Sequence, residues 1–382
     1  MSVTAAEGFT AGGVAAGIKP EGALDLALVD AGAPVPAVGV FTTNTAAAPP
    51  VLLTRAHLES GTARAVVLSS GCANAATGAA GMEASRQTAI AVADRLGCAP
   101  DDVLVCSTGP IGAVVPVDKI AAGLARIRLD ATGHTDAATA ILTTDSHPKE
   151  EAVAGAGGYT IGGMAKGAGM IRPDMATMLA VITTDAVADA PLLDKALRRA
   201  VSRSFNALNI DGCESTNDTV ILLASGASGI TPEPEVFAEE VTDVCRRLAH
   251  QMAADAEGAT RVVTIELSGA SDEETALVLA RAVADSALVR SSFYGADPNW
   301  GRIVAALGAT RIPFDLDAID IAYDGMVVAS RGLDAGIDSD AVADKLASDF
   351  TVSVTVGDGP GSCSLLTTDL TPEYVVFNGE RS

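Results

Sequence analysis

Residues 155–177 read GAGGYTIGGMAKGAGMIRPDMAT, and MLAVIT follows directly at 178–183. The first stretch is dense in glycine and ends in a proline-containing turn, which predicts a tight loop. The second is a short apolar run, which predicts a buried strand. Thr177 would then be the first residue of a core strand. An ordinary crossover between strands also contains glycine-rich turns, so this pattern alone predicts a fold element and no chemistry.

Strand-like and helix-like segments alternate along the chain around this stretch. Short apolar runs bounded by glycine and proline predict strands, and longer runs with helical spacing predict helices. The predicted strands are 27–29, 37–42, 65–69, 103–106 and 261–267; the predicted helices are 82–96, 117–129, 190–204, 235–256, 276–288 and 340–348. Otherwise, the last part of the chain reads as short strands and turns. The alternation indicates an α/β fold with a layered core.

Length and charge limit the classes of protein that fit. The chain has 382 residues and a formal net charge of −23. That length predicts two or three packed lobes, which we place at 1–187, 188–280 and 281–382. The negative charge, without a basic cluster, argues against nucleic acid as a partner. No signal-peptide pattern or bilayer-length apolar run is present, so we expect a cytoplasmic protein with no membrane partner.

The six cysteines and four histidines show no metal-ligand spacing. No two cysteines form a CxxC pair, so neither a zinc site nor a disulfide framework is predicted. Dispersed thiols of this kind suit a reducing compartment. We expect no metal and no organic cofactor.

Thr177 gains a chemical role only if the Ala176–Thr177 bond breaks. A threonine hydroxyl is a weak nucleophile unless a base lies beside it. A freed α-amine has a reference pKa near ~8 and can take the hydroxyl proton itself. Ala176 is small, and Pro173 with the surrounding glycines permits a strained turn. From these residues alone, a threonine that merely starts a strand is the more common interpretation.

Eight segments, in order along nearly the whole chain, resemble the ornithine acetyltransferase family, also called glutamate N-acetyltransferase. The most specific is GGMAKGAGMIRPDMATML at 162–179. The others are GFTAGGVAAGIK at 8–19, GVFTTN at 39–44, STGPIG at 107–112, TTD with PKE at 143–150, STNDT at 215–219, DAEGAT at 255–260 and DPNWGR at 297–302.

The resemblance implies a self-cleaving acyltransferase of arginine biosynthesis. Cleavage at Ala176–Thr177 would give chains 1–176 and 177–382, which stay associated, and we expect a heterotetramer with two copies of each. Thr177 would accept an acetyl group from N-acetylornithine and pass it to glutamate, so that ornithine leaves and N-acetylglutamate forms. The expected fold is an αββα-type core around the strand of Thr177, with smaller α+β lobes toward the C-terminus.

The resemblance also assigns the other site residues. The Thr108 hydroxyl and the Gly109 N–H would form the oxyanion hole. The residues that correspond to substrate contacts are Thr143, Lys166, Thr177, Glu257, Asn378 and Ser382. Lys166 would meet a substrate carboxylate, and Glu257 a substrate ammonium group. Without the resemblance, Lys166 would be a solvated loop lysine and Glu257 a surface carboxylate at a helix end.

Several positions depart from the family pattern and bear on the exact substrate. They are Ser69, Cys72, Pro110, Ser146, His147 and Ser382, the last of which comes one residue early. Pro110 favours an extended Gly109 and leaves its N–H available. Cys72 is expected to be a small buried residue, and His147 a surface residue.

Three other functions remain open. A self-cleaving amidase or aminopeptidase would share the nucleophile and the oxyanion hole but pass the acyl group to water. A bifunctional acetyltransferase would also accept acetyl-CoA, although we favour the form that only recycles acetyl groups. A nucleotide-binding or scaffold protein built on glycine-rich loops is the least favoured, because neither GxxxxGK[ST] nor GxGxxG occurs in the expected place.

Overall fold

The computed structural model describes residues 2–172 and 178–380. Their contacts form two compact units, Met1–Asn206 with Cys213–Met252, and Ala207–Gly212 with Ala253–Ser382. The lobe boundaries predicted from the sequence do not coincide with this division, because the helices and strand between 190 and 252 pack on the first unit.

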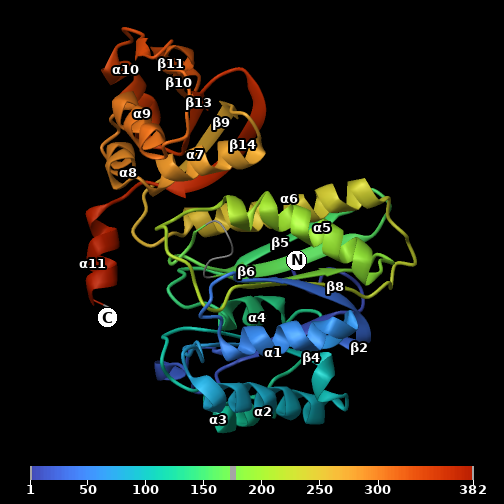
Figure 1. The fold of residues 1–382 in the computed structure, drawn as a ribbon. Coiled ribbons are helices and arrows are strands. Elements are labelled where there is room, and N and C mark those ends of the chain that lie inside the picture. The colour runs from blue at the N-terminus through green and yellow to red at the C-terminus, as the bar shows by residue number, and fades with distance from the viewer. Residues whose placement is uncertain (1, 173–177, 381–382) are drawn as a thin grey trace. The chain divides into compact units, whose positions relative to one another are not determined.

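One sheet runs through the first unit in the order β4-β3-β2-β8-β7-β6-β5, with β1 beside β2 (Figure 1). The long β2 (Leu26–Phe41) pairs with β3 (Thr62–Ser70) along its first half and with β8 (Thr219–Ala224) along its second. β7 (Leu179–Thr184) lies parallel to β8 and antiparallel to β6. The remaining strands are β1 (Thr10–Val14), β4 (Val103–Thr108), β5 (Lys149–Ala154) and β6 (Thr160–Lys166).

The two halves of this sheet face each other across an apolar core. Side chains from β6, β7 and β8 meet those of β3, β4 and α4 (His134–Ala140) in one cluster. The outer face of the β3–β4 half is covered by α2 (Gly78–Leu96) and α3 (Val117–Leu124). The outer face of the other half lies under α5 (Ala190–Ser202) and α6 (Pro234–Ala254) (Figure 1). These four layers confirm the expected αββα core.

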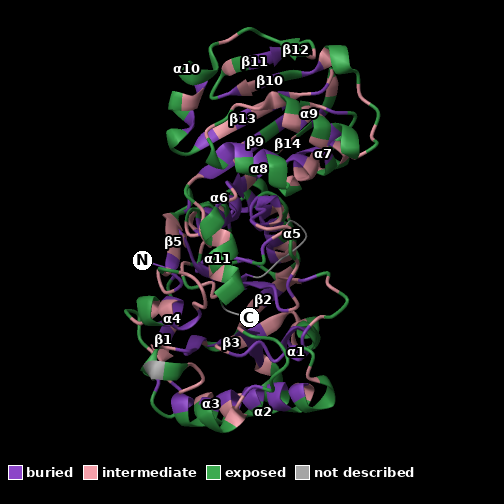
Figure 2. Cartoon of the chain, turned by 90° about the vertical axis from the view of Figure 1, so that its left-hand side faces the viewer, coloured by how far each residue is buried: buried purple, intermediate pink, exposed green. Residues whose placement is uncertain are grey.

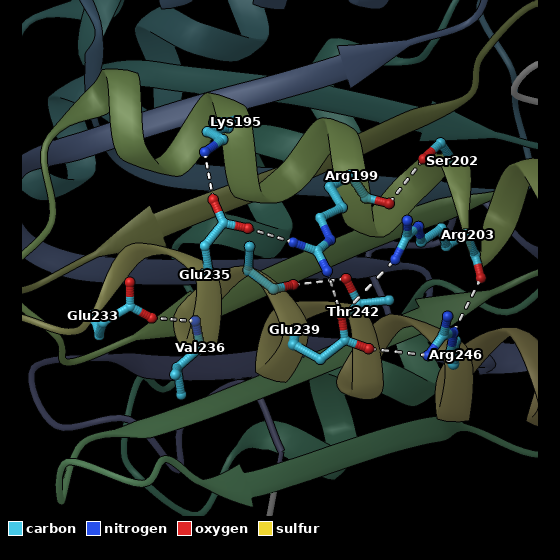
Figure 3. Close-up of polar contacts among 11 residues, drawn as sticks. Lys195, Arg199, Ser202, Arg203, Glu233, Glu235, Val236, Glu239, Thr242 and Arg246 are labelled. Carbon is cyan, nitrogen blue, oxygen red and sulfur yellow. Dashed lines mark hydrogen bonds and ion pairs between the residues drawn. The ribbon is translucent and has the colours of Figure 1, made fainter.

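Ion pairs tie α5 to α6 on the surface of the first unit (Figure 3). The Glu235 carboxylate lies 2.6 Å from Lys195 Nζ and 2.7 Å from Arg199 Nη1. Arg199 Nη2 also lies 2.8 Å from the Glu239 carboxylate. Each exposed pair contributes little to stability, but together they fix the two helices side by side. The remaining helix of this unit, α1, spans Pro49–His57.

The glycine-rich stretch differs from its predicted loop. Residues 160–166 form the strand β6, and the two glycines at its centre lie where a side chain would collide with neighbouring atoms. A Cβ on Gly162 would lie 2.0 Å from the Ser2 carbonyl oxygen, and one on Gly163 would lie 2.7 Å from the Ile182 side chain. Glycine therefore lets this strand pack closely between the N-terminal segment and the helix layer.

Two other predicted boundaries are also wrong. The strands predicted at 27–29 and 37–42 are one continuous β2. The helix predicted at 276–288 is two helices, α7 (Glu273–Asp285) and α8 (Ala287–Tyr294), because Ser286 ends the first and caps the second. The predicted strand at 178–183 is confirmed as β7, which begins at Leu179.

The second unit is an α+β structure with its own sheet, in the order β12-β11-β10-β13-β9-β14. Its core consists of one apolar cluster, and buried residues follow its inner strands in Figure 2. Its further elements are β9 (Val262–Gly269), α9 (Trp300–Ala309), β10 (Asp320–Tyr323), β11 (Met326–Ser330), β12 (Leu333–Asp334), α10 (Ser339–Ala343), β13 (Phe350–Thr355), β14 (Gly359–Thr368) and α11 (Pro372–Glu380). In the described part of the chain, no helix is both long and apolar enough to cross a membrane.

Candidate active site

β4 ends at the two residues predicted to form the oxyanion hole. Thr108 is its last residue and is buried, and Gly109 follows with a φ of 133°. A Cβ on Gly109 would lie 2.5 Å from the backbone nitrogen of Cys72. That nitrogen donates to the Thr108 carbonyl at 3.0 Å. Only glycine fits here, because two backbone segments meet at this corner.

A small cavity of about 50 Å³ lies beside this corner. Its lining consists of Ala73, Thr108, Gly109, Ile111, Met170, Ser215, Thr216 and Asn217. The buried amide of Asn217 donates to the carbonyl of Ala73 at 2.7 Å and to that of Ser107 at 2.9 Å. The STNDT segment therefore helps to hold the end of β4 in place.

Lys166 reaches the same corner from the end of β6. Its Nζ lies 3.5 Å from Thr108 Oγ1 and 3.8 Å from Asp145 Oδ2, and its side chain is 2% exposed. The expectation of a solvated loop lysine, which applied without the family resemblance, is therefore wrong. An ammonium group with so little water around it interacts strongly with any anion beside Thr108.

Asp145 organises the residues around Lys166. Its carboxylate contacts Lys149 Nζ at 2.6 Å and accepts the N–H groups of Gly167 at 2.6 Å and Thr143 at 3.1 Å. Burial alone would raise the pKa of Asp145, but the ammonium groups of Lys166 and Lys149 outweigh burial and hold that pKa below its usual range. Thr143, a predicted substrate contact, is therefore part of a charged, buried network.

The start of β7 is fixed by a second buried carboxyl group. Asp218 Oδ1 accepts the Met178 N–H at 2.7 Å, and the Asp218 side chain has no solvent exposure. Here burial raises the pKa well above its usual range, although the Met178 N–H and Lys166 act in the opposite direction. Leu179, the first residue of β7, pairs with Lys166 on one side and Thr219 on the other.

The predicted cleavage site, Ala176 and Thr177, lies outside the described residues, and so does Ser382. Met178 is the first described residue after the gap, and it is buried. The role of Thr177 therefore stays a prediction.

The other two predicted substrate contacts belong to the second unit. Asn378 on α11 donates to Glu257 Oε2 at 3.0 Å, and Asn378 is exposed. The described site residues thus fall into two groups, with Thr108, Gly109, Thr143 and Lys166 together in the first unit and Glu257 with Asn378 in the second.

The departures from the family pattern are mostly structural. Cys72 is buried, as predicted, and its thiol donates to the Ala113 carbonyl at 3.3 Å. His147 is exposed, as predicted, and its Nδ1 lies 3.0 Å from the Ser146 hydroxyl. Pro110 uses its carbonyl to accept the Ala73 N–H at 3.1 Å. None of these contacts gives Cys72 or His147 a catalytic role.

Three buried residues of the site were not predicted: Asp145, Lys149 and Asp218. A usable signal existed for Asp218 alone, which directly precedes the apolar strand TVILLA, whereas Asp145 and Lys149 stand among polar and charged residues. A charged residue is expensive to bury unless it is paired or functional. Among the described residues, no group of three or more histidine, cysteine or acidic side chains is arranged to hold a metal ion.

Solved structures with related sequences include two proteins of named function. A chain described as arginine biosynthesis bifunctional protein ArgJ from Bacillus halodurans is 32% identical, with a TM-score of 0.51, and the match covers 56% of this chain and 100% of that one. A chain of ornithine acetyltransferase from Mycobacterium tuberculosis, solved with ornithine, is 49% identical with a TM-score of 0.44, and the match covers 44% of this chain and 93% of that one.

Comparisons of sequence extend over the full chain. The arginine biosynthesis bifunctional protein ArgJ of Mycobacterium tuberculosis is 47% identical over 392 aligned residues, which cover 100% of this chain and 96% of that protein. The protein of the same name from Thermobifida fusca is 47% identical over 385 residues, covering 100% of both. A model of the ArgJ family matches residues 10–382. The chain therefore belongs to the ArgJ family of arginine-biosynthesis acyltransferases.

Proposed function

We propose that this enzyme moves an acetyl group from N-acetylornithine to glutamate through an acetyl ester on Thr177. The observation that carries the proposal is the buried Lys166 ammonium group, 3.5 Å from Thr108 Oγ1 and paired through its backbone with the start of β7. A cation, a hydroxyl donor and the strand that follows Thr177 thus belong to one small region. This combination suits a reaction in which negative charge develops on an acyl oxygen.

The nucleophile in this proposal is made by self-cleavage at Ala176–Thr177. The freed α-amine removes the proton from the Thr177 hydroxyl, which then attacks the acetyl carbonyl. One finding supports the cleavage. The full solved chain from Bacillus halodurans corresponds to 56% of this chain, and the expected C-terminal product, residues 177–382, is 206 of 382 residues, or about 54%.

Thr108 and Gly109 stabilise the oxyanion, and Lys166 holds the carboxylate of each amino-acid substrate. Both substrates carry an α-carboxylate, so a single cation can serve in each half-reaction. The Asp145 carboxylate keeps Lys166 charged and fixed, because the two groups lie 3.8 Å apart in a region with little water. Preorganised charge of this kind costs no reorganisation when the reaction occurs.

Glu257 and Asn378 are the proposed partners for a substrate ammonium group. Their hydrogen bond of 3.0 Å fixes the Glu257 carboxylate before a substrate binds. Ornithine carries an ammonium group on its side chain, which glutamate lacks. We therefore assign this pair mainly to the donor substrate.

A second candidate is a bifunctional enzyme that also takes its acetyl group from acetyl-CoA. The full-length relatives from Mycobacterium tuberculosis and Thermobifida fusca are named bifunctional proteins, which favours this candidate over the form that only recycles acetyl groups. Transfer of the acyl group to water, as in an amidase, remains the alternative from a different class of reaction.

Intact mass spectrometry of the purified protein tests the proposal, beside a Thr177→Ala variant. The expected result is two chains, ending at Ala176 and beginning at Thr177, in the wild type and one chain in the variant. The cleaved protein is then assayed with N-acetylornithine and either glutamate or water, and with acetyl-CoA and glutamate. A wild-type protein that stays a single active chain would remove Thr177 as the nucleophile.

A further inference from the structure

Lys19 is a half-buried lysine close to Gly109 that the proposed acyl transfer does not yet use. A Cβ on Gly71 would lie 2.8 Å from Lys19 Cγ, and a Cβ on Gly109 would lie 2.7 Å from the Gly71 carbonyl carbon. Gly71 directly follows β3 and Gly109 directly follows β4. The last residues of these parallel strands, Ser70 and Thr108, are paired. The Lys19 side chain therefore packs on the backbone beside the predicted oxyanion hole.

The backbone around Lys19 is fixed by the carboxylate of Asp25, which has no solvent exposure. That carboxylate accepts the N–H groups of Ala16 at 2.6 Å, Ile18 at 2.5 Å and Lys19 at 2.8 Å. Lys19 Nζ donates to the Leu24 carbonyl at 3.0 Å. An ammonium group carries three N–H donors, so a ligand can share it with this carbonyl. Lys19 is thus held in place before any ligand binds.

The charge of Lys19 adds to that of Lys166. Burial lowers the pKa of Lys19 below its ordinary value, and the Lys166 ammonium group acts in the same direction, whereas the carboxylates of Asp25 and Asp145 oppose the shift. Two ammonium groups that repel each other where water is scarce are unfavourable in the free protein. A bound anion relieves that repulsion, so convergent cations of this kind favour an anion-binding site.

A structural role alone accounts for fewer of these observations. The bond from Lys19 to the Leu24 carbonyl joins residues only five positions apart, and Asp25 already holds this loop through three backbone N–H groups. A neutral side chain at position 19 would pack on Gly71 without placing a second cation near Lys166. The charge at this position therefore indicates a ligand.

We propose that Lys19 binds the side-chain carboxylate of the acceptor glutamate, while Lys166 holds its α-carboxylate. Glutamate carries two carboxylates and ornithine carries one, so only the acceptor needs a second cation. Glu257 and Asn378 are already assigned to the ornithine ammonium group, which gives the two oppositely charged substrate side chains different partners. Lys19 selects a dicarboxylate as the acceptor. This inference rests on the proposed function, because it names a contact of that reaction's acceptor.

The test measures kcat/KM for each substrate separately, with the purified wild-type protein and three variants. In a transfer through an acetyl-enzyme, kcat/KM for N-acetylornithine reports the first half-reaction and kcat/KM for glutamate reports the second. Lys19→Met keeps the length of the side chain and removes its charge, and Lys19→Arg keeps the charge. Lys119→Met is the matched control, because the exposed Lys119 on α3 also donates to a carbonyl of this loop, that of Gly17.

We expect Lys19→Met to lower kcat/KM for glutamate roughly 10- to 100-fold, the usual effect of losing a hydrogen bond between charged groups. Its kcat/KM for N-acetylornithine should stay within about twofold of wild type, because the donor lacks the second carboxylate. Lys19→Arg should recover most of the loss with glutamate. Lys119→Met should match the wild type with both substrates.

The outcomes separate this inference from the proposed function. A wild-type protein that forms no N-acetylglutamate overturns the proposed function and this inference with it. If the wild type transfers the acetyl group and Lys19→Met loses nothing, only the role of Lys19 is overturned. Equal losses with both substrates in Lys19→Met, or the same loss with glutamate in Lys119→Met, assign Lys19 to the structure of the loop and also overturn its role.

Discussion

Replacing Asp145 by asparagine removes the only carboxylate that the described structure places in contact with both Lys149 and Lys166. These ammonium groups lie 2.6 and 3.8 Å from its oxygens, and the side chains of Asp145 and Lys149 have no exposure. Breaking a buried ion pair by removing one partner costs about 3–5 kcal/mol. Because two buried cations lose this carboxylate, we expect Asp145→Asn to lower the free energy of unfolding by about 4 kcal/mol.

The assay is urea unfolding at pH 7, followed by circular dichroism, with every variant in a Thr177→Ala background so that all proteins are single chains. With a slope near 3 kcal/mol per molar urea, the midpoint should fall by somewhat more than 1 M. Adding Lys149→Met to Asp145→Asn removes one of the two buried cations beside position 145 and should restore part of the loss. Asp194→Asn is the control: Asp194 pairs with Arg198 at 2.8 Å on an exposed face of α5, and its loss should cost less than about 1 kcal/mol.

The effect should depend on pH in one direction. The pKa of Asp145 is lower in the folded protein than in the unfolded chain. Its contribution is therefore complete above the unfolded pKa, near ~3.9, and is lost as the pH falls through the lower folded value. A loss below about 1 kcal/mol at pH 7, or a loss that does not shrink on acidification, would refute the charge argument.

Three further predictions concern the same corner of the first unit. Gly109→Ala should lower the free energy of unfolding by about 2–4 kcal/mol, seen in the same urea assay, because its Cβ would meet the Cys72 backbone at 2.5 Å. Lys166→Met should raise the KM for glutamate roughly 10- to 100-fold in steady-state assays, through loss of a charge-assisted contact. Cys72→Ala should leave the acetyl-transfer rate within about twofold of wild type, because its thiol only donates to a backbone carbonyl.

The elements of the fold that could be predicted are those set by local signals. α5 follows Asp189 and has proline at its start, and the structure shows the Asp189 side chain accepting the Leu192 N–H. β7 was predictable because MLAVIT is too short and too apolar for another element. Four αββα layers followed from the resemblance, and not from such local patterns.

The unpredicted elements depend on contacts that are distant in sequence. β6 contains Gly162 and Gly163, and glycine is a poor strand former in isolation. The strand is formed by pairing with β5 and β7, and glycine lets the Ser2 carbonyl lie against Gly162, with the Ser2 hydroxyl donating to the Gly163 carbonyl at 3.2 Å across 161 positions. No local pattern can reveal such a contact.

The candidate site divides in the same way. Through the resemblance, the motif STGPIG assigned Thr108 and Gly109 to the oxyanion hole. The structure explains why residue 109 is glycine, because a Cβ there would collide with the Cys72 backbone. The proximity of Lys166 to Thr108 joins positions 58 residues apart and came only from the resemblance. Asp145 was missed because its importance lies in burial, which one sequence does not display, and Asp218 was missed although it directly precedes an apolar strand.

The two missed carboxyl groups illustrate how one cation can support opposite chemistry. Lys166 lowers the pKa of both Asp145 and Asp218. Asp145 also has Lys149 at 2.6 Å and two backbone donors, so its charge is stabilised despite burial. Asp218 has the Met178 N–H and, among the described residues, no ion pair, so burial dominates and raises its pKa. Environments that shift the pKa values of two acids in opposite directions assign them different roles: Asp145 stays charged beside Lys149 and Lys166, and Asp218 holds the start of β7 through the Met178 N–H.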